Sequence, residues 1–582
     1  MTETATPPTD GAIVIPEAQA ALPHATRDEL DAAVAILQAH KDQWAGLGIA
    51  DRISLVDQVM QSTIDVSERW AAEAMLHKGI APGSAYDGED MSWGPMILLR
   101  TLRLFRKTLK DLHKHGQVKL PKQPYLRDNG QVAVPVFPPT AIDRALFPMT
   151  TAEIWLEPDV TLATMQTARI YTEGAPGQVC FVLGAGNVTS IGAVDVIQKL
   201  LVENQVCLLK MNPANEWVGP MIKAALAPLI REGYVRVVYG GVDVGGYLTT
   251  HPDIETLHMT GSDKTHDAIV YGVGEEGAKR KLADEPINDR PFSTELGNVS
   301  PVIVVPGPWT DEDLQYQGKQ IHAMINANGG FNCGSMRVLV THDAWDQRGA
   351  LLDQVKKCMR EAPDRKAFYP GARARWEAFT QAYPQAITYG DERDGNAPIT
   401  MIPDLDPTDT DQMAFRVESF NGVFGEAGFP GQSLVDYLAG VAEFCNKHLW
   451  GTLAATILVH PRTLKDPVAA AAVERLIAEL EYGTVCVNAW AGIGYGLTTT
   501  TWQAFPGHPR NNICSGDGWV HGTFMIEKPQ KSVIRAPWKL GKKPPGAYDF
   551  TTMPSLARRL ILVEGKGDVK QFPGIVMDGL KA

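Results

Sequence analysis

The feature that most constrains the fold is a regular alternation of buried strands and helices that begins at Gln178. QVCFVLG predicts a strand, the GAGN segment ending at Asn187 predicts a turn, and SIGAVDVIQKLLVEN predicts a helix that leads into the strand QVCLLKM. The pattern continues through VRVVYG and IETLHM to a helix from Lys264. Strands that alternate with helices over about 100 residues predict a parallel, doubly wound α/β sheet.

A second alternating region indicates a second α/β domain. It starts at SPVIVV, runs through a helix over 311–328 and the strand MRVLVT, and continues to about Asn488. Helical spacing from about Thr26 to Leu112 predicts a helical opening segment. These patterns divide the chain into a flexible tail over 1–25, a first domain over 26–305, a second over 306–523, and a C-terminal segment over 524–582 that wraps another domain or subunit.

Composition narrows the classes of partner. The chain has 582 residues, of which 44% are hydrophobic, which is ample for a large core, and its net charge of −13 provides no general basic surface for nucleic acid or an anionic membrane. Seven cysteines form no C-x-x-C pair, which favours a reducing compartment. Neither a signal peptide nor a long apolar run is found, so we expect a cytoplasmic protein that binds a small molecule.

Six short segments, in a fixed order after the GAGN turn, carry residues suited to chemistry. They are Lys210-Met-Asn-Pro213, Gly241 to Gly246, Met259-Thr-Gly261-Ser262, Glu295-Leu-Gly297, Asn328-Gly-Gly-Phe-Asn-Cys333 and Glu418-Ser-Phe420-Asn-Gly422. Cys333 follows a Gly-rich turn between a helix and a strand, where a thiol can be exposed and its pKa adjusted. His251 and His258 are interpreted as structural, since no metal-ligand spacing accompanies them and no metal site is expected.

Taken together, these segments resemble the aldehyde dehydrogenase superfamily over roughly residues 35 to 525. The resemblance implies two doubly wound domains, a Rossmann-like cofactor domain and a catalytic domain. It also implies that Cys333 is the nucleophile, that Glu295 is the general base that activates water, and that Asn187 donates to the oxyanion. The alternatives are a passive buried thiol for Cys333, a solvated surface acid for Glu295, and a helix N-cap or turn residue for Asn187.

The same resemblance implies that the cofactor is NAD or NADP. Lys210 and Glu418 match residues that bind the two cofactor riboses, and Phe420 matches an apolar neighbour of the nicotinamide ribose. The remaining cofactor-binding positions are glycine or serine in turns that let the cofactor approach closely: Gly241, Gly245, Gly261 and Ser262.

Several positions depart from the family pattern. The chain has Ala-Gly before Asn187, Phe-Asn before Cys333 and Asn-Gly after Phe420. Pro213 stands where the family has the acid that binds the adenosine ribose diol and repels a 2′-phosphate. The choice between NAD and NADP therefore stays open. Glu216 is the one nearby acid that could take the role of the missing family acid.

The expected reaction is oxidation of an aldehyde to a carboxylic acid through a cysteine thiohemiacetal and thioester. The alternative is an acyl-CoA reductase or CoA-acylating aldehyde dehydrogenase, because Gly-Asn-Val-Thr-Ser-Ile followed by LLVENQVCLLKM resembles such relatives. A non-catalytic binding or structural protein of the same fold is the third hypothesis. The family also implies a homo-oligomer, a dimer or tetramer, with residues 124–176 as the oligomerisation arm.

Overall fold

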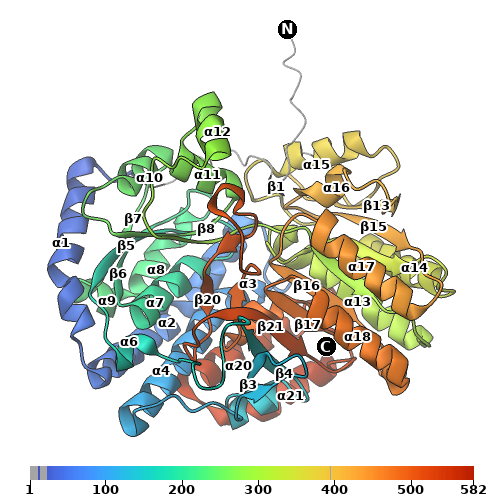
Figure 1. Ribbon diagram of the computed structural model, residues 1–582, viewed down its shortest axis with the longest axis horizontal. Helices are drawn as coiled ribbons and strands as arrows, with labels where there is room; N and C mark the ends of the chain where they lie inside the picture. The colour runs from blue at the N-terminus through green and yellow to red at the C-terminus, as the bar shows by residue number, and fades with distance from the viewer. Residues whose placement is uncertain (1–10, 13–21, 394) are drawn as a thin grey trace.

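A computed structural model describes residues 11–12, 22–393 and 395–582 of the chain. Most of the expected 1–25 tail therefore lies outside the described residues. Two parallel sheets form the core, the smaller on the left of Figure 1 and the larger on the right. This arrangement confirms the α/β class with two parallel-sheet domains.

The smaller sheet has the strand order β19-β9-β8-β5-β6-β7. Its strands are β5 (Gln178–Leu183), β6 (Gln205–Lys210), β7 (Val235–Val238), β8 (Thr256–Thr260), β9 (Phe292–Glu295) and β19 (Gly516–Asp517). The chain runs from β5 outward to β6 and β7 and then returns to place β8 and β9 on the other side of β5. This reversal creates a topological switch point beside β5, where parallel sheets usually bind their ligands.

Helices cover both faces of this sheet. They include α1 (Arg27–Ala45), α7 (Ile191–Glu203), α8 (Gly219–Ala225), α9 (Ala227–Arg231), α10 (Val242–Thr249), α11 (Asp263–Tyr271) and α12 (Gly274–Ala283). Every residue of α7 except Glu203 is buried, because the helix is covered by the sheet on one side and by other parts of the chain on the other. The helical opening segment is confirmed and continues as α2 (Ile49–Lys78), α3 (Glu89–Met91), the π-helical turn Ser92–Met96 and α4 (Ile97–His115).

The larger sheet has eleven strands in the order β12-β13-β15-β11-β10-β16-β17-β21-β4-β3-β2. Its parallel part consists of β13 (Ile399–Leu405), β15 (Val423–Phe429), β11 (Met336–His342), β10 (Ser300–Val304), β16 (Ala454–Leu458), β17 (Thr484–Val487) and β21 (Pro529–Arg535). The chain enters this sheet with β10, before residue 306. Helices on its faces include α13 (Asp311–Asn326), α14 (Arg348–Glu361), α17 (Leu434–His448) and α18 (Pro467–Glu479).

Residues 124–176 extend this larger sheet. They supply β2 (Tyr125–Leu126), β3 (Val132–Phe137) and β4 (Thr151–Leu156), and β4 pairs antiparallel with β21. Because β21 also pairs with β17 of the same chain, both of its edges are satisfied without a partner chain. The role of this segment as an oligomerisation arm stays a prediction.

The C-terminal segment is more regular than its many Pro, Gly and Lys residues indicate. It contains the expected strand, β21, but also two helices, α20 (Met553–Lys566) and α21 (Phe572–Lys581). The sequence interpretation missed both helices. Helix α20 packs against α2 and α4, at the bottom of the molecule in Figure 1.

A buried ion cluster joins α20 to the opening helices. Arg100 of α4, 1% exposed, lies 2.7 Å from Glu564 of α20 and 2.9 Å from Asp143 of α5 (Ala141–Leu146). Arg103 contacts the same two carboxylates, at 2.6 and 2.8 Å. Breaking a buried ion pair is strongly destabilising because the remaining charge stays desolvated.

We expect Glu564→Ala to lower the free energy of unfolding by about 3–5 kcal/mol, because Arg100 and Arg103 would keep a single shared carboxylate. The matched control is Glu474→Ala, which removes the exposed pair with Arg535 and should cost under about 1 kcal/mol. Urea denaturation followed by tryptophan fluorescence measures both changes. Equal midpoints for the two variants would contradict the assigned role of the cluster.

The expected homo-oligomer is tested by static light scattering. A dimer or tetramer should give a small multiple of the chain mass of 63.4 kDa. A single species at the monomer mass across a wide range of protein concentration would rule the oligomer out.

Candidate active site

One cavity collects the three residues expected to react. Asn187 lies in the loop after β5, Glu295 ends β9, and Cys333 lies in the loop before β11, and all three line the same cavity. The loops after β5, β8 and β9 meet here because the carboxyl ends of parallel strands share one edge of a sheet. Cys333 is contributed by the other sheet, so the cavity lies between the two domains.

A tight turn presents the Cys333 thiol. Gly329 and Gly330 adopt φ of 69° and 79°, and a Cβ on Gly330 would meet the Asn421 carbonyl oxygen at 2.4 Å. Only glycine fits this position, since a side chain would collide with backbone that cannot yield. The turn thus holds the thiol loop against the segment that follows Glu418.

The thiol is less accessible than its position in a Gly-rich turn predicts. Cys333 is half-buried, and burial raises the pKa of its thiol to about 12, with the Glu418 and Glu295 carboxylates adding to the increase. Arg337 opposes them. Since the nucleophile is the thiolate, Cys333 needs a nearby base or positive charge to react at neutral pH.

Two hydrogen bonds hold Asn187, one through its side-chain amide and one through its backbone carbonyl. Its Nδ2 donates to the Phe331 carbonyl oxygen at 3.0 Å, and its own carbonyl accepts from Asn328 Nδ2 at 3.0 Å. Helix α7 begins after Ser190, so the alternative that Asn187 caps this helix is wrong. A side-chain amide has two N–H groups, which leaves one for a ligand in the cavity.

Glu295 is a buried carboxyl beside the thiol. Its side chain is 4% exposed, and Oε1 has no hydrogen-bond partner among the described residues. The alternative of a solvated surface acid is therefore wrong. Burial raises the pKa of Glu295 well above its ordinary value, and the Asp195 carboxylate raises it further. Such a group readily holds a proton that it takes from water.

The positions expected to bind the cofactor lie at the same end of the smaller sheet. Lys210 ends β6, and a Cβ on Gly245 of α10 would lie 3.8 Å from its Cε. Gly241 is the residue before α10. Gly261 follows β8, and Ser262 caps α11 by accepting a hydrogen bond from the Thr265 N–H at 3.2 Å.

Glu418 and Phe420 approach the thiol loop from the larger domain. Glu418 ends β14 (Val417–Glu418), is 3% exposed, and has a pKa raised to about 7 by burial. A Cβ on Gly297 would meet Glu418 Oε2 at 2.0 Å, so the glycine of Glu295-Leu-Gly297 makes room for this carboxyl. The Phe420 ring packs 5.0 Å from Tyr369 and 6.3 Å from Phe331, measured between ring centroids.

Several residues of the cavity wall were missed by sequence analysis. Lys78 and Asp90 come from the opening helices and form an ion pair of 2.6 Å, and Lys78 also donates to Asn328 at 2.8 Å. Aromatic side chains complete the wall: Trp93, Trp490, Tyr495 and Trp502. Local sequence does not predict these residues as part of a cavity, because each lies in an ordinary amphipathic helix or loop. Only the tertiary fold brings them to the cavity.

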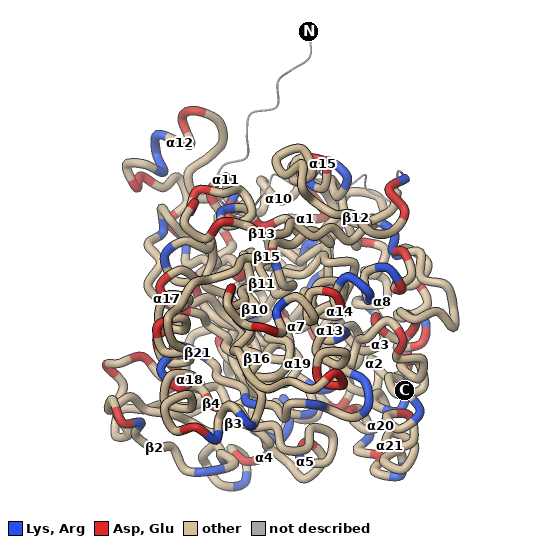
Figure 2. The backbone as a smooth tube through the Cα atoms, turned by 90° about the vertical axis from the view of Figure 1, so that its right-hand side faces the viewer, with Lys and Arg blue, Asp and Glu red and all other residues tan. Residues whose placement is uncertain are grey.

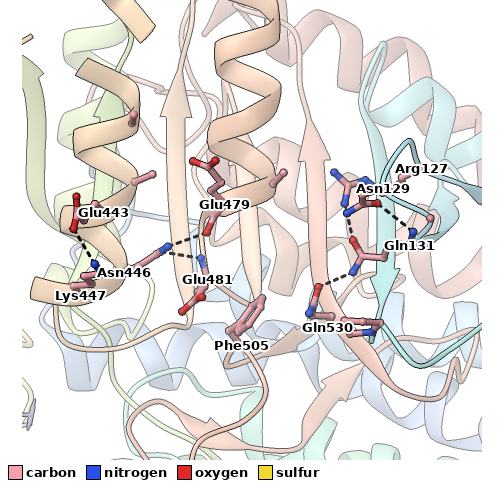
Figure 3. Close-up of a pocket in the computed structure, with 15 residues that line it drawn as sticks. Arg127, Asn129, Gln131, Glu443, Asn446, Lys447, Glu479, Glu481, Phe505 and Gln530 are labelled. Atoms are coloured by element: carbon pink, nitrogen blue, oxygen red, sulfur yellow. Dashed lines mark hydrogen bonds and ion pairs between the residues drawn. The ribbon is translucent and has the colours of Figure 1, made fainter. Parts of the chain in front are cut away.

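A second hollow lies away from the thiol, between the β2–β3 hairpin and helices α17 and α18. Figure 3 shows that its polar side chains mostly bind one another. Asn446 donates to the Glu479 carbonyl at 2.8 Å, Gln131 donates to Gln530 at 2.6 Å, and Lys447 pairs with Glu443 at 2.8 Å. No thiol or imidazole lines it, so this hollow offers no nucleophile or base of those kinds.

Neither a metal cluster nor a membrane span is found in the described part of the chain. Among residues 11–12, 22–393 and 395–582, no three His, Cys, Asp or Glu side chains are grouped to hold a metal ion. Within the same ranges, every helix is too short or too polar to cross a bilayer. Acidic and basic residues are interspersed along the backbone in the view of Figure 2.

Comparison with known proteins finds aldehyde dehydrogenases by sequence and a shared fold among solved structures. Residues 148–381 match the model of the Aldehyde dehydrogenase family. An aldehyde dehydrogenase of Enchytraeus buchholzi is 32% identical over 148 residues, which are 24% of this chain and 26% of that protein. Betaine aldehyde dehydrogenase 2 of Rhizobium meliloti (strain 1021) is 28% identical over 376 residues, covering 60% of this chain and 68% of that protein. The first of these matches thus spans only about a quarter of its relative.

Solved structures share the fold at low sequence identity. A putative aldehyde dehydrogenase from Burkholderia cenocepacia superposes with a TM-score of 0.59 and 16% identity, covering 88% of this chain and 93% of that one. An NADP-dependent glyceraldehyde-3-phosphate dehydrogenase from Bacillus halodurans C-125, complexed with NADP, gives 0.59 and 17%, with 90% and 95% covered.

The raised pKa of Cys333 predicts its reactivity in the protein without ligands. We expect the rate of alkylation by iodoacetamide to increase about tenfold per pH unit from pH 7 to 9, because the thiolate fraction grows in that proportion below the pKa. At pH 8, Glu418→Gln should react faster, since removal of a neighbouring negative charge lowers the thiol pKa. Mass spectrometry of tryptic peptides locates the label, with Cys333→Ser as the blank. A rate that levels off below pH 8 would contradict this environment.

Proposed function

We propose that this chain, which carries an aldehyde dehydrogenase family domain, oxidises an aldehyde to a carboxylic acid with NAD or NADP through a thioester on Cys333. The observation that carries the proposal is the shared cavity of Cys333, Glu295 and Asn187. A thiol, a carboxyl and an amide from three distant segments have no structural need to meet there, whereas the reaction needs all three. This also argues against a purely structural protein of the same fold.

The residues around the cavity fit a nicotinamide dinucleotide. Glu418 Oε1 is buried and makes no hydrogen bond to the described part of the chain, so a ribose hydroxyl could supply the missing donor. Lys210 and Gly245 would hold the other ribose at the switch point, where a glycine allows close approach. When bound, the cofactor supplies a hydride acceptor. Structural neighbours are consistent with either cofactor. The Bacillus halodurans enzyme is complexed with NADP, and an aldehyde dehydrogenase from Sinorhizobium meliloti is NAD-dependent.

The first chemical step is attack of the Cys333 thiolate on the aldehyde carbonyl carbon. The new C–S bond places a negative charge on the carbonyl oxygen. The free N–H of Asn187 Nδ2 and the Cys333 backbone N–H are the donors that stabilise this charge, and Asn187 is already oriented by its bond to the Phe331 carbonyl. Loss of hydride from the thiohemiacetal carbon then leaves a thioester on Cys333.

Hydrolysis of the thioester depends on Glu295. Its carboxylate takes a proton from water, the water oxygen bonds to the thioester carbonyl carbon, and the C–S bond breaks to return the Cys333 thiolate and release the acid. Burial of Glu295 beside the thiol supports this assignment, because a raised pKa makes it a stronger base than an ordinary carboxylate. Transfer of the acyl group to coenzyme A would not need such a base.

The preference between NAD and NADP depends on whether a carboxylate near Pro213 can repel the 2′-phosphate of NADP. Glu216, the nearby acid, is fully buried in the 3₁₀ turn Glu216–Val218 and accepts a hydrogen bond from the Leu22 N–H at 2.8 Å. A carboxyl held in this way is engaged by the protein backbone. We therefore propose that the described residues near Pro213 include no acid dedicated to repelling a 2′-phosphate and that this chain accepts NADP.

Three variants test the proposed reaction. Cofactor reduction followed at 340 nm, with a panel of aldehydes and either cofactor, should be abolished by Cys333→Ala, because no thioester can form. Asn187→Ala should lower kcat by about 10²–10³-fold through loss of one oxyanion donor. Glu295→Gln should allow a first turnover but lower the steady-state rate by about 10²-fold or more, since water must then attack the thioester without a base to take its proton.

Coenzyme A distinguishes the alternative reaction. Cys333-dependent turnover without coenzyme A supports the hydrolytic dehydrogenase. Turnover that requires coenzyme A, or that starts only from acyl-CoA with reduced cofactor, would move the protein to the acylating or reducing relatives and leave Glu295 without its assigned role. Full turnover by Cys333→Ala would refute both.

A further inference from the structure

Two ionisable side chains lie fully buried behind the cavity and take no part in the reaction described so far. Asp195 of α7 is 0% exposed, and His258 of β8 is 1% exposed. Burial of such groups costs free energy unless each has a polar partner, so their presence requires an explanation. Sequence analysis assigns His258 a structural role, but its surroundings point elsewhere.

These two residues belong to a line of polar groups. The Thr260 hydroxyl donates to Asp195 Oδ2 at 3.4 Å. His258 Nε2 lies 3.4 Å from the same oxygen, at ion-pair distance, and makes no hydrogen bond to the described residues. On the other side of the imidazole ring, His258 Nδ1 lies 2.9 Å from Ser293 Oγ. Thr260 lines the cavity together with Glu295, whereas Ser293 is half-buried. The line therefore runs from the cavity toward the surface.

The outer end of the line is tied to an exposed carboxylate. Lys199 donates from Nζ to Ser293 Oγ at 2.7 Å and to the two Glu203 oxygens at 2.8 and 2.9 Å. The Glu203 side chain is 34% exposed. Lys199 thus orients the Ser293 hydroxyl and connects it to a carboxylate that solvent reaches.

Regular secondary structure aligns these groups. Thr260 is paired with Glu295 and His258 with Ser293 in the parallel ladder of β8 and β9. Residues two apart on a strand face the same side, so all four side chains point to one face of the sheet. Asp195 and Lys199, four apart on α7, share one side of the helix that covers this face.

We propose that Asp195 and His258 form a proton relay that carries the proton taken up by Glu295 from the cavity to Ser293 and the surface. The inference rests on the proposed function, in which hydrolysis gives Glu295 one proton per turnover. Glu295 is 4% exposed and must lose that proton before the next cycle. The Thr260 hydroxyl, which lines the cavity together with Glu295 and donates to Asp195 Oδ2, passes the proton on to Asp195.

The transfer balances without any other reactant. Asp195 Oδ2 receives the proton from the cavity side and passes it to His258 Nε2, which must turn from its 3.4 Å approach into hydrogen-bonding geometry for the transfer. The ring then gives up the proton on Nδ1 to Ser293 Oγ, which releases its own proton to solvent. Imidazole suits this step because its two nitrogens lie on opposite sides of the ring and exchange roles on each transfer.

Asp195 has a second effect on Glu295. Its carboxylate, after burial, raises the pKa of Glu295, while Lys199 and the Val520 backbone N–H lower it. Tyr495 and Cys333 also face this group of acids from the cavity wall. Asp195→Asn should therefore lower the pKa of Glu295 while it blocks the relay, a combination that loss of packing would not produce.

The test compares the first turnover with later ones. Stopped-flow measurement of cofactor reduction gives the rate of hydride transfer in the first turnover, and the steady state includes hydrolysis and proton loss. For Asp195→Asn and His258→Gln we expect the ratio of first-turnover to steady-state rate to increase about tenfold or more over the parent protein. The matched control is His322→Gln, which replaces a histidine that is 1% exposed on α13. Its ratio should stay within about twofold of the parent.

Two further measurements keep the test decisive. The acid limb of the kcat–pH profile of Asp195→Asn should move to lower pH while its plateau falls. His258→Ala should regain steady-state rate on addition of imidazole, whereas His322→Ala should not respond. Parental ratios in both relay variants, or an unmoved acid limb together with no imidazole rescue, would overturn the relay and leave the proposed function intact. Absence of Cys333-dependent reduction in the parent protein would overturn both.

Discussion

The shared direction of parallel strands is the constraint on which the whole site depends. Because β5, β8 and β9 all end at one edge of the smaller sheet, the residues that follow them converge without any need for sequence proximity. Asn187, Thr260 and Glu295 occupy this edge. The larger sheet completes the site by bringing Cys333 to it on a turn that only glycine can make, at Gly330.

Local patterns in the sequence predict β5, β6, β7 and β8 of the smaller sheet well because these strands are mostly buried and appear as apolar runs between turns. The reacting residues could be placed by their resemblance to a family, and the structure adds their environment. It shows that Asn187 does not cap α7 and that the Cys333 thiol has a pKa raised to about 12. A pKa depends on burial and on charges from distant segments, so no local pattern predicts it.

Other features could not be predicted because they depend on contacts between distant parts of the chain. Helix α20 occurs in a segment rich in Pro, Gly and Lys, and its buried Glu564 meets arginines more than 400 residues earlier. The ion pair of Lys78 with Asp90 belongs to helices that look like any amphipathic surface helix. His258 similarly appears as a core residue until its neighbours on β9 and α7 are known.

The origin of the cavity wall has a consequence for how this protein can change. The proposed reacting groups come from the two sheets and the loops beside them, whereas Lys78, Asp90 and Trp93 come from the opening helices, which precede Asn187 by about 100 residues. Mutations in those helices can reshape part of the cavity without replacing any of the proposed reacting residues. Part of the cavity wall is therefore encoded apart from these residues, and the opening helices are one region to randomise when a new substrate is sought.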